Sequence, residues 1–310
     1  MRIRHLLRLI AMALVPALLA IGFQSPADAA AAHKAPLTAK KTYKLLWSQE
    51  FNSTKTVGPS SKVFTYDIGD GSTGPGPGWG NNELEYYTDK NARTDKHGNM
   101  VITATRIPTA DGPTEQYPYF CGSQPTEVCP WISSRFHTAG KIGFQYGKIE
   151  ARMQMPVGDG TWPAFWLLGA NVNTKGWPDS GEIDIMEGSG ADPFLARGSA
   201  HGPGYSGAEA RTNIKYSRTS LQTSFHTYAI EWTKDVIVWY LDGKAYFTLK
   251  AKDVKPNKWP MNQEFFLILN LAVGGWFVGN VVDPTLQSAQ FKIDYIRYYS
   301  INGVGKLIKH

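Results

Sequence analysis

The stretch GEIDIMEG, residues 181–188, places three acidic residues among three apolar ones, between two glycines. In a regular strand, successive side chains point to opposite faces, so Glu182 and Asp184 share one face and the two isoleucines share the other. Glu187 would then fall on the apolar face. One extra residue near Ile185–Met186, a β-bulge, would bring Glu187 back to the face of the other acids. The stretch therefore predicts a bulged strand whose isoleucines enter a core.

Three carboxyl groups in line on one face suit the hydrolysis of a glycosidic bond. Like charges this close disfavour joint ionisation and raise one pKa. A retaining glycosidase uses one ionised carboxylate as nucleophile and one protonated carboxyl as acid, about 5–5.5 Å apart. Two other interpretations of an acidic strand stay open, namely a calcium site and a solvated edge strand.

Three tryptophans, Trp162, Trp166 and Trp177, lie close to these acids in the sequence. Flat aromatic rings stack on the apolar faces of sugar rings. Any one of them could instead pack in the core. Three tryptophans beside three acids favour a carbohydrate-binding cleft.

The rest of the chain indicates an all-β domain. Period-2 alternation at Lys148–Met155 predicts a half-buried strand, and the apolar run Phe265–Val273 predicts a fully buried one. Asp242-Gly243 between two β-rich runs predicts a hairpin with a type I′ turn. Further strands are expected at Lys44–Phe51, Met100–Arg106, Ala164–Leu168, His226–Thr233, Val236–Leu241, Lys244–Leu249 and Phe291–Tyr299. Many short strands with Gly/Pro turns predict a sandwich or barrel.

Composition excludes several classes of protein. Aromatic residues make up 13% of the chain and charged residues only 19%, whereas disordered chains are rich in charge and poor in aromatics. The formal net charge is +6, without a run of Lys/Arg and interleaved aromatics, so no nucleic-acid partner is expected.

The N-terminus predicts a secretory signal peptide over residues 1–29. Arg2, Arg4 and Arg8 precede an apolar stretch, and Ala27-Asp28-Ala29 forms a small-x-small cleavage site. An uncleaved membrane anchor is the alternative. Cleavage would remove three Arg and one Asp and lower the formal charge from +6 to +4. We expect a secreted, extracellular protein that has no membrane partner after cleavage.

The two cysteines, Cys121 and Cys129, lie in a Pro-rich insertion. In an exported chain this pair suggests a disulfide that closes a short loop. Two free thiols are the alternative, and no second Cys/His pair lies at the spacing of a metal site.

One motif carries no function. Residues 69–74 match G-x-G-x-x-G, but Pro75 and Pro77 follow, so the helix that a dinucleotide site requires cannot begin there. The segment predicts a loop.

The pattern W-P-x-x-G-E-I-D-I-M-E, residues 177–187, resembles the active-site signature of glycoside hydrolase family 16. The laminarinase-like endo-β-1,3-glucanases of this family carry the bulged E-x-D-x-x-E form, whereas lichenases and carrageenases carry E-x-D-x-E. The blocks GNNELEYY (80–87), YGKIEAR (146–152), WPAFW (162–166) and DYIR (294–297) also resemble family blocks, in the family's order. The resemblance covers about residues 44–299.

The resemblance implies a concanavalin-like β-jelly-roll sandwich of two antiparallel sheets with a concave substrate cleft. It implies Glu182 as nucleophile, Glu187 as general acid/base and Asp184 as an assisting carboxylate. It implies substrate contacts by Asn81, Arg135, Trp162, Trp166, Trp177, His201 and Trp276. His201 could instead serve the structure of its loop, and Arg135 could pair with a surface acid.

The resemblance implies no cofactor for catalysis. Many relatives bind a structural calcium on the convex face, and the matching positions here are Glu50, a carbonyl near Gly98, and Asp294. An empty site is the alternative.

The sequence therefore predicts a signal peptide (1–29), a leader (30–43), a catalytic domain (44–300) and a tail (301–310). We expect a monomeric retaining endo-β-1,3-glucanase whose partner is a β-glucan polysaccharide. Alternatives are a mixed-linkage β-1,3-1,4-glucanase, another family 16 glycanase or transglycosylase, and, outside enzymes, a β-glucan-binding lectin.

Overall fold

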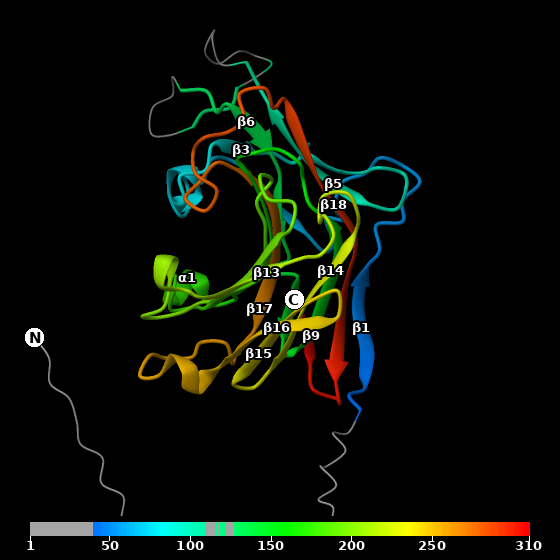
Figure 1. Cartoon of the computed structure of the whole chain (residues 1–310), viewed down its shortest axis with the longest axis vertical. Helices are drawn as coiled ribbons and strands as arrows, with labels where there is room; N and C mark the ends of the chain where they lie inside the picture. Colours follow the sequence, from blue (N-terminus) through cyan, green and yellow to red (C-terminus); the bar gives the residue numbers. More distant parts are fainter. Residues whose placement is uncertain (1–39, 109–115, 117, 122–126) are drawn as a thin grey trace, which may run out of the picture. The chain divides into compact units, whose positions relative to one another are not determined.

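The computed structural model describes residues 40–108, 116, 118–121 and 127–310 (Figure 1). By its contacts the chain divides into Met1–Lys40 and Lys41–His310, and the second unit is described here. The expected signal peptide and nearly all of the expected leader lie outside the described residues. β1 begins at Tyr43, the last residue of the segment expected to be leader.

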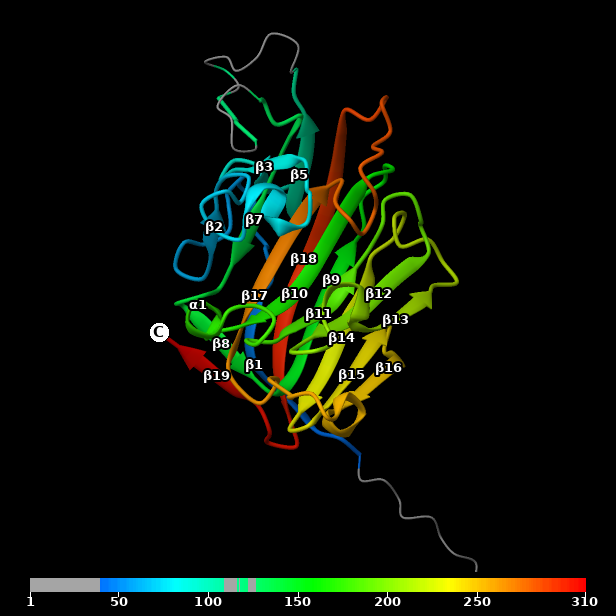
Figure 2. The same ribbon diagram turned by 90° about the vertical axis from the view of Figure 1, so that its left-hand side faces the viewer.

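The described residues of this unit form two β-sheets packed face to face, with short helices confined to the connections (Figures 1 and 2). The first sheet has ten strands: β1 (Tyr43–Gln49), β3 (Glu85–Tyr87), β4 (Ala92–Thr94), β5 (Met100–Arg106), β6 (Trp131–Ser133), β9 (Gly147–Gln154), β14 (His226–Thr233), β15 (Val236–Leu241), β16 (Lys244–Lys250) and β18 (Ser288–Ile301).

The second sheet has nine strands: β2 (Thr65–Asp67), β7 (Arg135–His137), β8 (Ile142–Gln145), β10 (Thr161–Gly169), β11 (Glu182–Glu187), β12 (Leu195–His201), β13 (Arg211–Tyr216), β17 (Phe265–Val273) and β19 (Lys306–Lys309). Its main path runs β13-β12-β11-β10-β17-β7-β2, so β11 lies well inside the sheet. The helices of the described unit are α1 (Val172–Lys175) and three 3-10 turns, η1 (Pro77–Gly80), η2 (Gly207–Glu209) and η3 (Ala251–Val254).

Strand pairing in the described residues is antiparallel throughout, except between β3 and β6, which are parallel. The chain is therefore an all-β sandwich, as its sequence predicts. One departure is the parallel β3–β6 pair; β4 and β5 lie between these two strands in the sequence.

The core lies between the sheets and is built from alternate residues of their strands. In β9, Ile149, Ala151 and Met153 are buried, whereas the residues between them are partly exposed, which confirms the half-buried strand. β17 is buried along its whole length, as its apolar run predicts. Trp232 and Phe265 join the two sheets edge to face, with ring centroids 5.3 Å apart.

Two local predictions can be compared directly with the backbone. The hairpin between β15 and β16 turns at Asp242 and Gly243, whose φ angles of 49° and 70° are those a type I′ turn requires. Cys121 and Cys129 form a disulfide, as expected, and the backbone pairs antiparallel beside it, between Phe120 and Val128. The bond closes its own loop, and Cys129 is buried although it is not a member of the main core cluster.

The segment 301–310, expected as a tail, contains a further strand. After a turn, Lys306–Lys309 form β19, which pairs with β8 in register Lys306↔Gln145 to Lys309↔Ile142. Leu307 packs against the core cluster, and this burial accounts for the extra strand. No helix of the described residues is long and apolar enough to cross a membrane.

Candidate active site

The predicted bulge is present in β11. Against β10, Asp184 and Met186 face the consecutive residues Trp166 and Phe165, so Ile185 is the extra residue. Against β12, the register passes from Asp184↔Ser199 to Glu187↔Arg197, which again leaves one residue over. Ile183, Ile185 and Met186 are all buried in the core cluster. The bulge thus keeps the apolar residues inside, as the sequence predicts.

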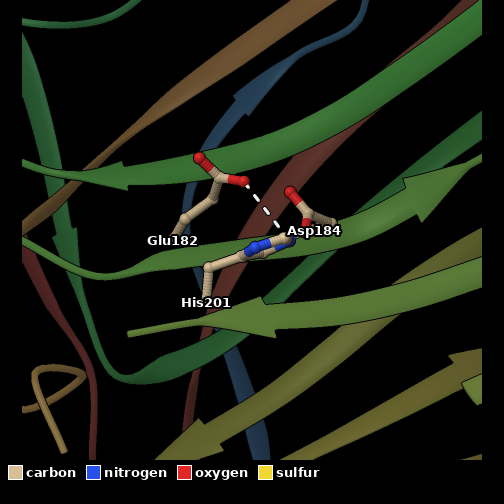
Figure 3. Close-up of side chains that lie close together, drawn as sticks. All are labelled: Glu182, Asp184 and His201. Carbon is tan, nitrogen blue, oxygen red and sulfur yellow. Dashed lines mark ion pairs between the residues drawn. The ribbon is translucent and has the colours of Figure 1, made fainter. Parts of the chain in front are cut away.

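The bulge brings Glu187 to the face that carries Glu182 and Asp184. Register partners in a sheet point to the same face, so Ser199 shares the face of Asp184. The Ser199 hydroxyl lies 3.2 Å from Glu187 Oε2, so Glu187 is on that face too. His201, the partner of Glu182, faces both Glu182 and Asp184 (Figure 3). We call this outer surface of the nine-stranded sheet the acid face.

Glu182 lies between a tryptophan and a histidine. The indole N–H of Trp177 donates to its Oε2 over 3.1 Å, and His201 Nε2 lies 3.6 Å from its Oε1. Burial, followed by the negative charge of Asp184, raises the pKa of Glu182 to about 8. The charge of Asp184 therefore opposes the ionisation of Glu182, whereas the hydrogen bond from Trp177 favours it.

Asp184 is the most enclosed of the three acids, at 4% exposure. His201 Nε2 lies 3.1 Å from its Oδ2. Burial, followed by the nearby charge of Glu187, raises the pKa of Asp184 well above its usual value. From the opposite sheet, Trp239 Nε1 donates to the backbone carbonyl of Asp184 over 2.8 Å, which fixes the residue where the bulge begins.

Glu187 has a donor at each oxygen. Trp162 Nε1 lies 3.2 Å from Oε1, the Ser199 hydroxyl lies 3.2 Å from Oε2, and Arg197 Nε lies 3.7 Å from Oε2. Arg197 is itself held by Thr212 Oγ1 at 2.9 Å and by the ring of Phe277, whose centroid is 5.0 Å away. Sequence reasoning missed Arg197 and Ser199. Arg197, Ser199 and His201 alternate along one strand, so the sequence could have placed them on one face. Only the register with β11 shows that this face is the one that carries the acids.

Trp166 lies on the acid face as the register partner of Asp184, and Trp162 lies there because its indole N–H donates to Glu187. Both are half-buried, and Trp177 is 49% exposed, so the alternative of core packing does not describe them. Trp276 is 75% exposed and is tied by its backbone N–H to the carbonyl of Asn81, 3.0 Å away.

Arg135 and Asn81 belong to connected groups beside the acids. The Arg135 guanidinium lies over Trp79 and Trp166, 4.5 and 5.0 Å from their ring centroids, and forms an ion pair of 2.9 Å with Asp67. Arg135 therefore does pair with an acid, which was the alternative to a substrate contact, although Asp67 is only partly exposed.

A chain of hydrogen bonds runs from Trp166 to Asn81. It passes from the Trp166 indole to Asn270 (2.8 Å), from Asn270 to the Tyr87 hydroxyl (3.1 Å), from Tyr87 to Glu83 (3.0 Å), and ends where Asn81 Nδ2 donates to Glu83 (2.9 Å). One of the two N–H groups of Asn81 Nδ2 is used in this way, which leaves its second N–H and its side-chain oxygen for contact with a ligand.

In the described part of the chain, Glu182, Asp184 and His201 form a group whose potential ligand atoms all lie within 4.8 Å of one another. His201 Nδ1 accepts the backbone N–H of Gly207 at 3.2 Å, so the neutral ring carries its proton on Nε2, the atom that faces the acids. A protonated Nε2 does not bind a metal. The trio is better described as an imidazole N–H close to two carboxyl groups, 3.6 Å from Glu182 Oε1 and 3.1 Å from Asp184 Oδ2.

The residues of the expected calcium site do not fit a cation as they stand. Both oxygens of Glu50 accept from Arg297, at 3.0 and 2.8 Å, and Asp294 is paired with Arg152. Each carboxylate is already neutralised by a guanidinium. These ion pairs give no support to the calcium site of Glu50, Gly98 and Asp294. The site stays a prediction.

A two-sheet sandwich that presents three carboxyls, a histidine and tryptophans on one outer face defines a class of glycan-hydrolysing enzymes. Residues 80–297 match the family model of Glycosyl hydrolases family 16, and the chain belongs to this family. Its fold is accordingly the jelly-roll sandwich that the sequence led us to expect.

Solved structures and curated proteins agree with this membership. The catalytic domain of an endo-1,3-beta-glucanase (laminarinase) from Thermotoga petrophila RKU-1 is 38% identical, with a TM-score of 0.75 over 84% of this chain and 99% of that one. The laminarinase catalytic domain from Thermotoga maritima MSB8 is 39% identical, with a TM-score of 0.74 over 83% and 98%. A beta-glucanase from Rhodothermus marinus is 36% identical over 272 residues, 83% of this chain and 85% of that protein.

Proposed function

We propose that this protein is a secreted retaining endo-β-1,3-glucanase that cuts internal bonds of laminarin-type glucans. The observation that carries the proposal is the bulge in β11, because it brings Glu187 to the same face as Glu182 and Asp184. The similarity to two laminarinases over almost their whole length supports the glucan as substrate.

In the first step Glu182 attacks the anomeric carbon and the bond to the leaving oxygen breaks, while Glu187 transfers its proton to that oxygen. The product is a sugar ester of Glu182. In the second step Glu187, now ionised, takes a proton from water, the water oxygen attacks the anomeric carbon, and Glu182 leaves as a carboxylate. Two inversions give net retention of configuration.

The surroundings of Glu182 favour its role as nucleophile once Asp184 holds a proton. The pKa of both acids is raised by burial, and that of Asp184 well above its usual value, so a proton is retained on the pair. With that proton on the more enclosed Asp184, the repulsion on Glu182 disappears. The indole of Trp177 then stabilises the Glu182 carboxylate by donating to it.

The tryptophans would form the walls of the cleft. Trp162 and Trp177 each donate an indole N–H to one of the proposed catalytic glutamates, which fixes their rings beside the reacting bond. The backbone N–H of exposed Trp276 donates to the backbone carbonyl of Asn81, so these two residues lie side by side and would contact a sugar further along the chain.

The test is incubation with laminarin, lichenan, agarose and carrageenan, followed by product analysis and by NMR of the newly formed anomeric centre. We expect a series of laminarin oligosaccharides that first appear in the β configuration. Activity on lichenan or a galactan without activity on laminarin would contradict the substrate. Binding to laminarin without cleavage would instead identify a lectin, and longer products than the starting oligosaccharide would identify a transglycosylase.

A further inference from the structure

A cavity of about 440 Å³ opens on the ten-stranded sheet, over β4, β5 and β18. This is the other sheet from the acid face (Figure 1). Arg93 and Lys292 are both register partners of Val101 on β5, so the three form a row across the strands. The neighbouring row, Ala92, Ile102 and Phe291, is buried in the core, so the row of Arg93 and Lys292 faces outward. We call this cavity the outer trough.

The outer trough is strongly cationic. Lys90, Arg93, His97 and Lys292 line it, against one acid, Asp95. The Asp95 carboxylate is occupied inside its own turn, where it accepts from the backbone N–H groups of residues 97 and 99, at 2.8 and 3.0 Å, and from the Asn99 side chain at 2.7 Å. Asp95 keeps its negative charge, so Lys90, Arg93 and Lys292 place three permanent positive charges in the trough against one negative charge.

Two of these cations have no partner among the residues that the structure describes. Within the part of the chain that the structure describes, the ammonium groups of Lys90 and Lys292 make no hydrogen bond or ion pair. Other basic groups of the same sheet are paired, such as Arg152 with Asp294 and Arg297 with Glu50. Unpaired lysines around a cavity in which cations outnumber the one acid suit a ligand that brings its own negative charge.

Uncharged polar groups lie beside the cations. Gln290 and Thr103 are register partners and line the same cavity, two residues along their strands from Lys292 and Val101. Two residues of a strand span about 6.8 Å, so a ligand in contact with both rows is larger than a single small ion. The cavity volume falls in the range of about 300–1,000 Å³ typical of sites for organic ligands.

We propose that the outer trough is a second, non-catalytic binding site for an acidic glycan. The oxyanion of the glycan, a sulfate ester or a uronate carboxylate, is held by Lys90 and Lys292, and its hydroxyls contact Gln290 and Thr103. A free inorganic oxyanion could also bind the two lysines, but it would not reach Gln290 and Thr103. The site does not depend on the glucanase proposal, and it would attach the enzyme to an anionic matrix while the acid face stays free.

The test compares the full chain with two double variants of equal charge change. K90E/K292E alters the outer trough, and K244E/K306E alters two exposed lysines, on β16 and β19, outside it. Binding to dextran sulfate, polygalacturonate, neutral dextran and sodium sulfate is measured by calorimetry at physiological salt, where diffuse attraction is screened. Cleavage of laminarin oligosaccharides by all three proteins reports on folding.

We expect the wild type to bind dextran sulfate or polygalacturonate, but not neutral dextran. K90E/K292E should weaken this binding at least about tenfold and K244E/K306E less than about twofold, with activity unchanged in both. Equal losses in the two variants would show diffuse charge attraction and overturn the site. If sodium sulfate binds as tightly as dextran sulfate does per sulfate group, the ligand is a simple oxyanion and the proposal of a glycan is wrong.

Discussion

The indole N–H of Trp239, on the ten-stranded sheet, donates a 2.8 Å hydrogen bond to the backbone carbonyl of Asp184 on the other sheet. Both residues are buried, so no water replaces this bond if it is lost. The carbonyl belongs to the residue at which β11 leaves its regular register. A buried core residue of one sheet thus holds the backbone of the strand that carries the acids.

Trp239→Phe should therefore affect both stability and catalysis. Loss of the donor leaves a buried carbonyl unpaired, and we expect the free energy of unfolding to fall by about 1–3 kcal/mol. A shift of the acids should lower kcat up to about 100-fold, because catalytic groups tolerate little misplacement. Denaturant unfolding and laminarin kinetics measure the two effects.

Trp232→Phe is the matched control. Trp232 is equally buried and donates to the carbonyl of Met261 over 2.9 Å, away from the acids. It should cost similar stability and leave kcat of the folded enzyme within about twofold. An equal fall in kcat for both variants would contradict a special role of Trp239.

Glu187→Ala should separate the acid role from the nucleophile role. A natural glucan needs its leaving oxygen protonated, so we expect kcat/KM on laminarin to fall about 10²–10⁴-fold. An aryl glycoside with an acidic phenol as leaving group needs little protonation, and its glycosylation rate should fall far less. Burst kinetics on the aryl substrate measure this step. Equal losses on both substrates would remove Glu187 from the acid role.

Stability should fall with rising pH because of Glu182 and Asp184. The pKa of both acids is raised in the folded protein, that of Glu182 to about 8, mainly by burial. Above the ordinary carboxyl pKa the unfolded chain loses its protons while the folded chain retains at least one. From about pH 4.5 to 8 the free energy of unfolding should therefore decrease by about 1.4 kcal/mol per pH unit for each retained proton.

The double variant Glu182→Gln/Asp184→Asn removes these titrating groups and should flatten the pH profile in this range. Glu209→Gln, on the exposed turn η2, should leave the wild-type slope in place. A wild-type slope in the double variant would show that other groups set the profile.

Glu85 provides a prediction outside the acid face. It is fully buried, and burial followed by the charge of Glu83 raises its pKa well above the usual value, which favours its neutral form. Its Oε2 accepts the backbone N–H of Val273 over 2.7 Å. A glutamine keeps both the neutral state and the acceptor, so Glu85→Gln should change the free energy of unfolding by less than about 1 kcal/mol. Glu85→Leu leaves the Val273 N–H unpaired and should cost about 1–3 kcal/mol more.

The strands of this fold could be predicted from local pattern wherever one face is buried. The predicted bounds of β5, β14 and β17 agree with the structure. Each of these strands is a continuous run rich in apolar and β-branched residues. The bulge was predictable too, because a regular strand would have placed Glu187 in the core.

The surroundings of Glu187 could not be predicted in the same way. Arg197 and Ser199 lie on β12, and their contact with Glu187 depends on the register between two strands joined by a loop, which no local pattern specifies. The link from Trp166 to Asn81 likewise runs through Asn270 and Tyr87, residues far apart in the sequence. Such contacts are a property of the assembled sheet.

The last strand, β19, has a consequence for how the chain ends. β19 covers β8 at the margin of the nine-stranded sheet, and the final residue is fastened there by its backbone N–H to Lys141 and by its ring to Glu264. A protein shortened before Lys306 would leave the N–H and C=O groups of β8 open, as a template on which another molecule could add a strand. Residues 306–309 therefore supply the backbone partners of β8, and their removal is expected to expose those groups.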